Sequence, residues 1–355
     1  MNVVLCDKDF NEIYLLNYYK SVIWNTRFND IGDFEIYIPV LNKDILDYVN
    51  MFYYVYIDNK NNIRIITDIK ISFSQSEGYM LTITGHTLNY LLKSRIVWEQ
   101  TNYTNKSISY ILTQLLFDNC IINSTTTTNR GLFDGVTVQS TINKQVTAQY
   151  YGETLYDVIK GLCKQCYAGF NVTKNNLNKL YVNIFKYRDK TATSGSSNPI
   201  IFDTRLNNIL NFDIDYQGEI YKNVELITGE GDGVSKLRQT VNDDAYACLD
   251  RFELYVNAQD LSQNEGTAQA ITQSQYLEIL QQRGLKNLEN YKIQNNLNCT
   301  IDPNYYTFNV DYQVGDMVTM ITPFLSQNVI IKEVTENWGE NGYNVSITLD
   351  QNIEE

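Results

Sequence analysis

Histidine is almost absent from this chain, since His86 is the only one among 355 residues. A Ser-His-Asp or Cys-His mechanism would have to run through His86, and one histidine cannot build a multi-histidine zinc site. The sequence also lacks the Gly-x-Ser-x-Gly elbow of many hydrolases. We therefore expect His86 to be a turn or helix-cap residue.

Long hydrophobic runs are missing too. No apolar stretch approaches the roughly 18 residues of a membrane helix. The N-terminus has no cationic start followed by an apolar stretch, and residues 1–9 predict a strand. We expect a chain that is made and folded in the cytoplasm and does not insert into a membrane.

Basic residues are too few to balance the acidic ones. The chain has 28 Lys and Arg against 41 Asp and Glu, which gives a net charge of −13. Binding to the outside of nucleic acid needs Lys and Arg to displace counterions. This balance therefore argues against a protein that grips nucleic acid.

Cysteines offer one motif, Cys163-Lys164-Gln165-Cys166, while the other four are scattered singly. A C-x-x-C can be redox-active or half of a zinc site, but the zinc interpretation needs a second pair. Both cysteines also complete the apolar stripe of a predicted helix, where free cysteine packs as a small hydrophobe. We interpret them as reduced core residues.

Paired carboxylates leave a hydrolase open, because glycoside hydrolysis needs two acids and no fixed spacing in sequence. The pairs are Glu230 with Asp232, Asp243 with Asp244, and Asp213 with Asp215. All are more typical of solvated loops or strand edges, and calcium binding by residues 230–232 lacks the twelve-residue ligand pattern. We expect no catalytic, cofactor-binding or metal-binding residue.

Strand signals dominate residues 1–98, and the 28 tyrosines suit half-buried strand faces and subunit interfaces, or reflect strand propensity alone. Apolar runs flank polar turns in the pattern of hairpins. The hairpins pair residues 53–58 with 63–73, and 65–74 with 79–85. Short helices are expected at 43–50 and 87–93.

The middle of the chain has the apolar stripe of two helices, near 108–116 and 155–166. The polar loop over 124–129 is expected to be exposed. Residues 170–173 and 179–187 are expected to pair as strands, and residues 188–198 are expected to form a flexible boundary. Strands then return at 209–216, 222–229 and 251–256. A helix over 272–292 follows, with Gly284 at a close approach, and the closing strands cover 293–301, 317–322, 329–338 and 343–349.

Three segments resemble one family in the same order. Residues 22–39 contain the pattern IWxxRF…G-x-FE-x-YIP. Residues 249–260 are similar to a stretch RRELYVDARD, with Asn257 and Gln259 departing from its charges, and residues 312–318 are similar to a Y-x-x-GD-x-V turn. The chain, from about residue 3 to 349, thus resembles the phage tail baseplate hub or tail-tip family, equivalent to the N-terminal hub region of tail-associated lysins.

The resemblance implies a β-rich α+β fold with two β-barrel-like tube-type domains and an inserted mixed α+β middle domain. The expected units are 1–98 (N-terminal barrel), 99–198 (inserted domain), 199–292 (returning strands plus the long helix) and 293–355 (C-terminal barrel). Any duplication between the barrels rests on analogy, because the sequence shows no similarity between them.

Six residues of the three motifs are candidates for structural or interface roles: Trp24, Arg27, Gly32, Arg251, Gly315 and Asp316. We expect Trp24 in the core, Gly32 in a turn, and Arg27 paired with an acid such as Glu35 or with a neighbouring subunit. No catalytic role is assigned to any of them.

The resemblance implies a non-enzymatic structural hub, a homotrimer at the tip of a phage tail or tail-like particle. It would join the sixfold tail tube or distal tail protein to a threefold central spike, fibre or receptor-binding assembly, and would close the channel. DNA would be passing cargo, and an acidic lumen would let it slide. The alternatives are a tail-tip carbohydrate-binding protein that adheres to the host wall and a wall hydrolase, although in this family hydrolysis belongs to domains beyond the hub region.

Overall fold

The computed structural model describes residues 1–350 except 42, 58–61, 123–128, 264–270 and 341. Its described strands form four sheets, and the largest has 14 strands. None of these sheets closes on itself. The β-rich α+β class is confirmed, while the two-barrel arrangement and the predicted domain limits stay predictions.

The N-terminal part forms one half of the large sheet. Its elements are β1 (Val3–Cys6), β2 (Glu12–Leu16), β3 (Ser21–Arg27), β4 (Asp33–Pro39), α1 (Ile45–Tyr48), β5 (Tyr54–Ile57), β6 (Ile63–Ser74), β7 (Gly78–Thr87) and the 3-10 helix η1 (Leu88–Ser94). Apolar residues alternate along β4, so that Phe34, Ile36 and Ile38 are buried. Both predicted hairpins, β5 with β6 and β6 with β7, are confirmed.

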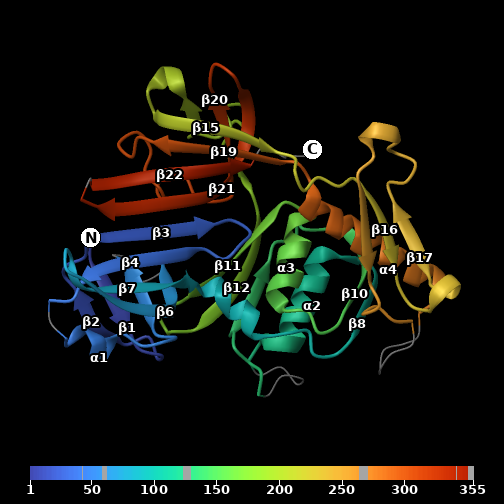
Figure 1. The fold of residues 1–355 in the computed structure, drawn as a ribbon, viewed down its shortest axis with the longest axis horizontal. Coiled ribbons are helices and arrows are strands. Elements are labelled where there is room, and N and C mark those ends of the chain that lie inside the picture. The colour runs from blue at the N-terminus through green and yellow to red at the C-terminus, as the bar shows by residue number, and fades with distance from the viewer. Residues whose placement is uncertain (42, 58–61, 123–128, 264–270, 341, 351–355) are drawn as a thin grey trace.

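The C-terminal part forms the other half. Its elements are β13 (Arg188–Asp189), β14 (Ile201–Asp203), η2 (Thr204–Leu206), β15 (Ile209–Gln217), β19 (Gln294–Ile301), β20 (Asp316–Ile321), β21 (Ser326–Gly339) and β22 (Gly342–Asp350). Strand β21 pairs antiparallel with β3, which places Glu333 opposite Arg27 and Trp338 opposite Val22. The N-terminal and C-terminal parts of the chain thus lie side by side in one sheet (Figure 1).

Eight strands of the large sheet follow one another in the order β15-β19-β22-β21-β3-β4-β7-β6, which we call the eight-strand run. It consists of two four-strand units that meet at the β3–β21 pair. Each unit covers its own buried cluster, one around Trp24, Ile36 and Ile83 and the other around Phe202, Ile331 and Ile347. The two halves therefore have separate cores and share one sheet.

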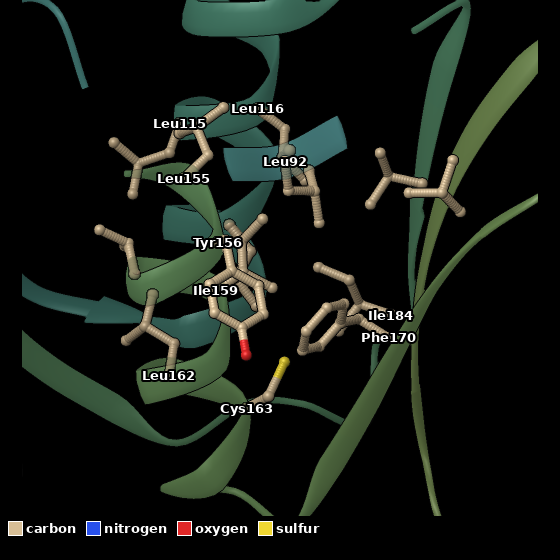
Figure 2. Packing of buried hydrophobic residues seen from close by; sticks show 14 of the residues in the cluster. Leu92, Leu115, Leu116, Leu155, Tyr156, Ile159, Leu162, Cys163, Phe170 and Ile184 are labelled. Carbon is tan, nitrogen blue, oxygen red and sulfur yellow. The ribbon is translucent and has the colours of Figure 1, made fainter. Parts of the chain in front are cut away.

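The middle part carries its own core. It consists of β8 (Thr101–Ser107), α2 (Ile108–Cys120), β9 (Gly135–Val138), β10 (Gln145–Tyr150), α3 (Leu155–Lys164), β11 (Ala168–Lys174) and β12 (Leu180–Lys186). Both predicted helices are confirmed, and each begins at a hydroxyl cap, Ser107 or Thr154. Their apolar stripes face each other and the strand residues Phe170 and Ile184 (Figure 2). Most of the predicted loop over 124–129 lies outside the described residues.

A smaller unit packs on this middle part. It consists of β16 (Val224–Thr228), η3 (Gly233–Ser235), β17 (Arg238–Val241), η4 (Cys248–Asp250), β18 (Glu253–Asn257), α4 (Gln273–Leu288) and η5 (Glu289–Tyr291). Helix α4 begins at a capping box of Thr272 and Gln275. The close approach at Gly284 is confirmed, because a Cβ there would lie 2.6 Å from Val241 Cγ2.

The segment 188–198 differs from the flexible boundary that its composition predicts. Its first two residues form β13, which pairs parallel with β20. The Arg188 guanidinium contacts the carboxylate of Asp316, which is fully buried. A polar, serine-rich segment is therefore held at its start by one ion pair, between a half-exposed arginine and a buried carboxylate.

Candidate functional site

Phe28 lies where the N-terminal, middle and C-terminal parts of the chain meet. A Cβ on Gly169 of β11 would lie 2.2 Å from its ring, and a Cβ on Gly315 would lie 2.3 Å from it. The Phe28 N–H donates to the carbonyl of Lys332 (2.9 Å), and its carbonyl accepts from the N–H of Phe170 (3.1 Å). We call Phe28, Gly169 and Gly315 the Phe28 junction, because one side chain fits the space left by two glycines from distant segments.

Arg27, next to Phe28 in the chain, links β3 to β4 and β21 through its side chain. Its guanidinium pairs with Asp33 (2.6 Å) and with Glu333 (2.5 Å) and donates to the carbonyl of Ile31 (2.7 Å). Burial lowers the pKa of Arg27, but the hydrogen bonds and charges of the two carboxylates outweigh it and raise the pKa. The predicted pairing of Arg27 with an acid is confirmed, but the acids are Asp33 and Glu333 and not Glu35, because the β3–β21 register brings Glu333 opposite Arg27. A role for Arg27 between subunits stays a prediction.

Trp24 and Gly32 have structural positions. Trp24 is fully buried, and the guanidinium of the equally buried Arg64 lies 4.1 Å from its ring centre. At Gly32, a Cβ would lie 2.2 Å from the carbonyl oxygen of Asn25. Glycine is therefore required there by the close approach of two backbones.

Gly315 and Asp316 form the turn that enters β20. Gly315 has a φ of +85°, which other residues rarely adopt. Asp316 is fully buried, accepts two hydrogen bonds from the Arg188 guanidinium at 2.7 and 2.8 Å, and accepts a third from the N–H of Gln313 at 2.8 Å. The Gly-Asp pair thus shapes the turn, receives Phe28 and anchors β13.

Arg251 lies apart from the other candidates. It pairs with Asp243 (2.6 Å) and Glu253 (2.5 Å) within the β16–β18 unit, and both acids are exposed. Sequence reasoning did not single out Phe28, Gly169 or Arg188. Phe28 could have been found, because it ends the quoted pattern IWxxRF, whereas Gly169 and Arg188 stand in no motif.

A cleft of about 380 Å³ opens beside Phe28. Its charged lining residues are Asp30, Lys160, Lys164, Glu289, Lys292, Lys332 and Asp350. Burial opposes ionisation of Asp30, but hydrogen bonds from Lys160 and Tyr156 lower its pKa overall. Among these residues Lys160 of α3 pairs with Asp30 at 2.6 Å and Lys292 pairs with Glu289 at 3.0 Å, so ion pairs line the cleft between α3 and the C-terminal strands.

His86, the two cysteines of the C-x-x-C motif and Glu230 make packing contacts or hydrogen bonds within the fold. His86 lies in strand β7, paired with Asp33 of β4 and Ile65 of β6, and not in the predicted turn or helix cap. Burial lowers its pKa, and its ring stacks on that of Tyr90, with ring centres 5.1 Å apart. Cys163 and Cys166 are buried in the middle core, and burial raises the pKa of both thiols, to about 11 for Cys166, which confirms core packing. Glu230 accepts a hydrogen bond from the Ser262 hydroxyl at 2.9 Å.

Within the described residues, no group of three or more His, Cys, Asp or Glu is placed to hold a metal ion. No helix of that part of the chain has the length and apolar character needed to cross a membrane.

Glu225 is a buried acid between β16 and α4. Its Oε1 accepts from the Asn287 amide at 2.9 Å, and its Oε2 is buried without a hydrogen-bond partner in the described structure. Burial raises the pKa of Glu225 to about 7, against an ordinary value of 4.5. The folded chain therefore holds this proton more tightly than the unfolded chain does.

Replacing Glu225 with glutamine is expected to stabilise the protein by about 2–3 kcal/mol at pH 8 and to change little at pH 4.5. Because the folded pKa is raised, the stability linked to Glu225 is present below pH 4.5 and is lost as the pH rises through 7. The measurement is urea unfolding of both proteins from pH 4.5 to 8. A difference that does not depend on pH would contradict the assignment.

The family model described as Siphovirus ReqiPepy6 Gp37-like protein matches residues 2–349. No curated protein matched the sequence. The predicted resemblance to phage tail proteins is confirmed at this level.

Solved structures of tail proteins share the fold over nearly the whole chain. The 43 kDa tail protein of prophage MuSo2 from Shewanella oneidensis has a TM-score of 0.59 at 13% identity, covering 98% of both chains. A tail protein from Neisseria meningitidis MC58 has a TM-score of 0.56 at 13% identity, covering 99% of this chain and 96% of its own. Prophage tail protein gp18 from Listeria monocytogenes EGD-e has a TM-score of 0.54 at 13% identity, covering 100% and 96%. With the tail-protein fold and a family match from residue 2 to 349, the chain belongs to the Siphovirus ReqiPepy6 Gp37-like protein family.

Proposed function

We propose that this chain is a non-enzymatic structural protein of the phage tail, and within the tail the hub of the baseplate or tip. The observation that carries this proposal is the eight-strand run, in which two four-strand units with separate cores lie side by side in one chain. A ring of three such chains presents six units. It can therefore match a sixfold tube on one side and a threefold spike or fibre on the other.

The composition of the sheet face opposite the two cores supports a lining for a passage. In the strand registers, Asp213, Asn298, Thr348, Glu333 and Arg27 form one row across five strands. A second row contains Asn211, Thr300, Ser346, Thr335 and Asn25. A third row contains Asn344, Asn337, Ile23, Glu35, Thr84 and Asp68.

We call these three rows the polar face. Its charged side chains are four carboxylates, Asp213, Glu333, Glu35 and Asp68, and one cation, Arg27, which is already paired, and the same side of the sheet continues to Asp215 on β15 and Lys70 on β6. DNA gains affinity from unpaired Lys and Arg that replace its counterions. A polar face of this composition, turned toward the channel, would let DNA pass without binding it. The proposed partners of this chain are two further copies of itself, the tail tube or distal tail protein, and the central spike or fibre.

The location can be tested on virions with an antibody against this chain and gold labelling in the electron microscope. Label confined to the distal end of the tail is the expected result. Label along the tube or on the capsid would contradict the hub proposal. Binding of the isolated protein to host wall glycans without label at the tip would favour the carbohydrate-binding alternative, and loss of turbidity of host walls would favour the hydrolase.

A further inference from the structure

Both ends of the eight-strand run have an open strand edge. Strand β15 pairs only with β19 in the described structure. Strand β6 pairs with β7 along its length, but on its other side it pairs with β5 only over residues 63–65. Residues 68–74 of β6 and residues 211–217 of β15 thus both present backbone groups without a neighbouring strand (Figure 1). Open edges are templates for pairing with another chain.

The directions of the strands fit a join between copies. Every neighbouring pair of the run, from β15–β19 to β7–β6, is antiparallel. Because the run contains an even number of strands, β6 and β15 point in opposite directions. When copies are arranged around an axis, β6 of one copy therefore lies antiparallel to β15 of the next, and the alternation continues unbroken.

The side chains on the core side of the two edges are apolar. On β6 they are Ile69, Ile71 and Phe73, of which Ile71 is 54% and Phe73 62% exposed. On β15 they are Phe212, Ile214 and Tyr216, of which Tyr216 is 62% exposed. Large apolar side chains at this exposure gain from burial against one another.

On the polar face, one register also satisfies the charges. If Lys70 lies opposite Asp215, then Asp68 faces Gln217 and Ser72 faces Asp213, so no two like charges meet. The same register places Ile71 opposite Ile214 and Phe73 opposite Phe212. Opposite charges and apolar pairs directly across two strands both favour pairing.

We propose that β6 of one copy pairs with β15 of the next with Lys70 opposite Asp215, which joins three copies into a closed ring through one repeated interface. The two edges differ, so the interface is heterologous and closes into a ring. The inference rests on the proposed hub, in which three copies form the ring.

The test is a disulfide between copies, in the full-length protein with the exposed Cys248 replaced by serine. Lys70→Cys and Asp215→Cys are introduced together, because facing residues in antiparallel strands have Cα atoms about 4.5–5.5 Å apart, within the reach of a disulfide. Under mild oxidation we expect a covalent trimer on a denaturing gel. The matched control combines Lys70→Cys with Asp213→Cys, whose diagonal spacing of about 7–8 Å should give little product.

A second set of variants tests the ion pair without cysteines. Lys70→Asp and Asp215→Lys are each expected to weaken the trimer in native mass spectrometry, and the double exchange is expected to restore it. A trimer that forms but gives no disulfide at 70/215 would overturn the edge pairing and leave the hub standing. A strict monomer without a disulfide would overturn self-pairing, whereas the gold label on virions decides the hub independently.

Discussion

Replacing Phe28 with alanine is expected to lower the free energy of unfolding by about 3–5 kcal/mol, as for other buried phenylalanines. The ring is 4% exposed and fits between Gly169 and Gly315, which have no side chains to fill the space it leaves. The resulting cavity would lie between three parts of the chain. The effect should therefore spread to the contact of β11 with the large sheet, where the N–H of Phe170 donates to Phe28.

Urea unfolding measures the total effect, and hydrogen exchange locates it. We expect faster exchange in β11 and at the start of β20, with less change in α2. Phe324→Ala is the matched control, because Phe324 is 81% exposed and its loss should cost no more than about 0.5 kcal/mol. Equal effects of the two substitutions would show that the Phe28 junction does not hold the parts together.

Local patterns predicted most elements of this chain. The i, i+3, i+4 stripes of α2 and α3 and the alternation along β4 depend on neighbouring residues only. The close approach at Gly284 was also predictable from local sequence, since it follows from the apolar face of one helix. Such signals are complete within a short window, which is why sequence reasoning found them.

Contacts between distant segments could not be predicted in this way. The pairing of β3 with β21 brings Glu333 to Arg27 across most of the chain, and no local pattern distinguishes Glu333 from Glu35 as the partner. The same holds for Gly169, which is needed only because Phe28 arrives beside it. Phe28 and Gly315 stand in two of the motifs, but that they meet each other and Gly169 depends on the tertiary structure.

The serine-rich segment after residue 188 shows how one pair can override composition. Its polar residues are typical of a linker. The ion pair of Arg188 with a buried carboxylate nevertheless holds β13 against β20. The strength of that single anchor can be measured directly.

Asp316→Asn is expected to destabilise the protein by about 2–3 kcal/mol, because it breaks charged hydrogen bonds to a fully buried group whose partner, Arg188, is about half exposed. Both Asp316 oxygens accept from the Arg188 guanidinium, and one also accepts from the N–H of Gln313. An amide of the same shape would turn an N–H₂ group toward one of these donors. We expect lower stability in urea and faster hydrogen exchange at residues 188–190.

The control for Asp316→Asn is Glu253→Gln, which removes a carboxylate from Arg251. The Glu253 side chain is 66% exposed, so solvent screens its pair with Arg251, and the loss should stay below about 1 kcal/mol. The two Arg–carboxylate pairs have similar lengths, but the loss of stability on breaking them would then differ severalfold, because only Asp316 is buried. If Asp316→Asn proved as mild as Glu253→Gln, the anchor of β13 would have to come from its backbone pairing with β20, and Gly315 would matter only for the turn and for Phe28.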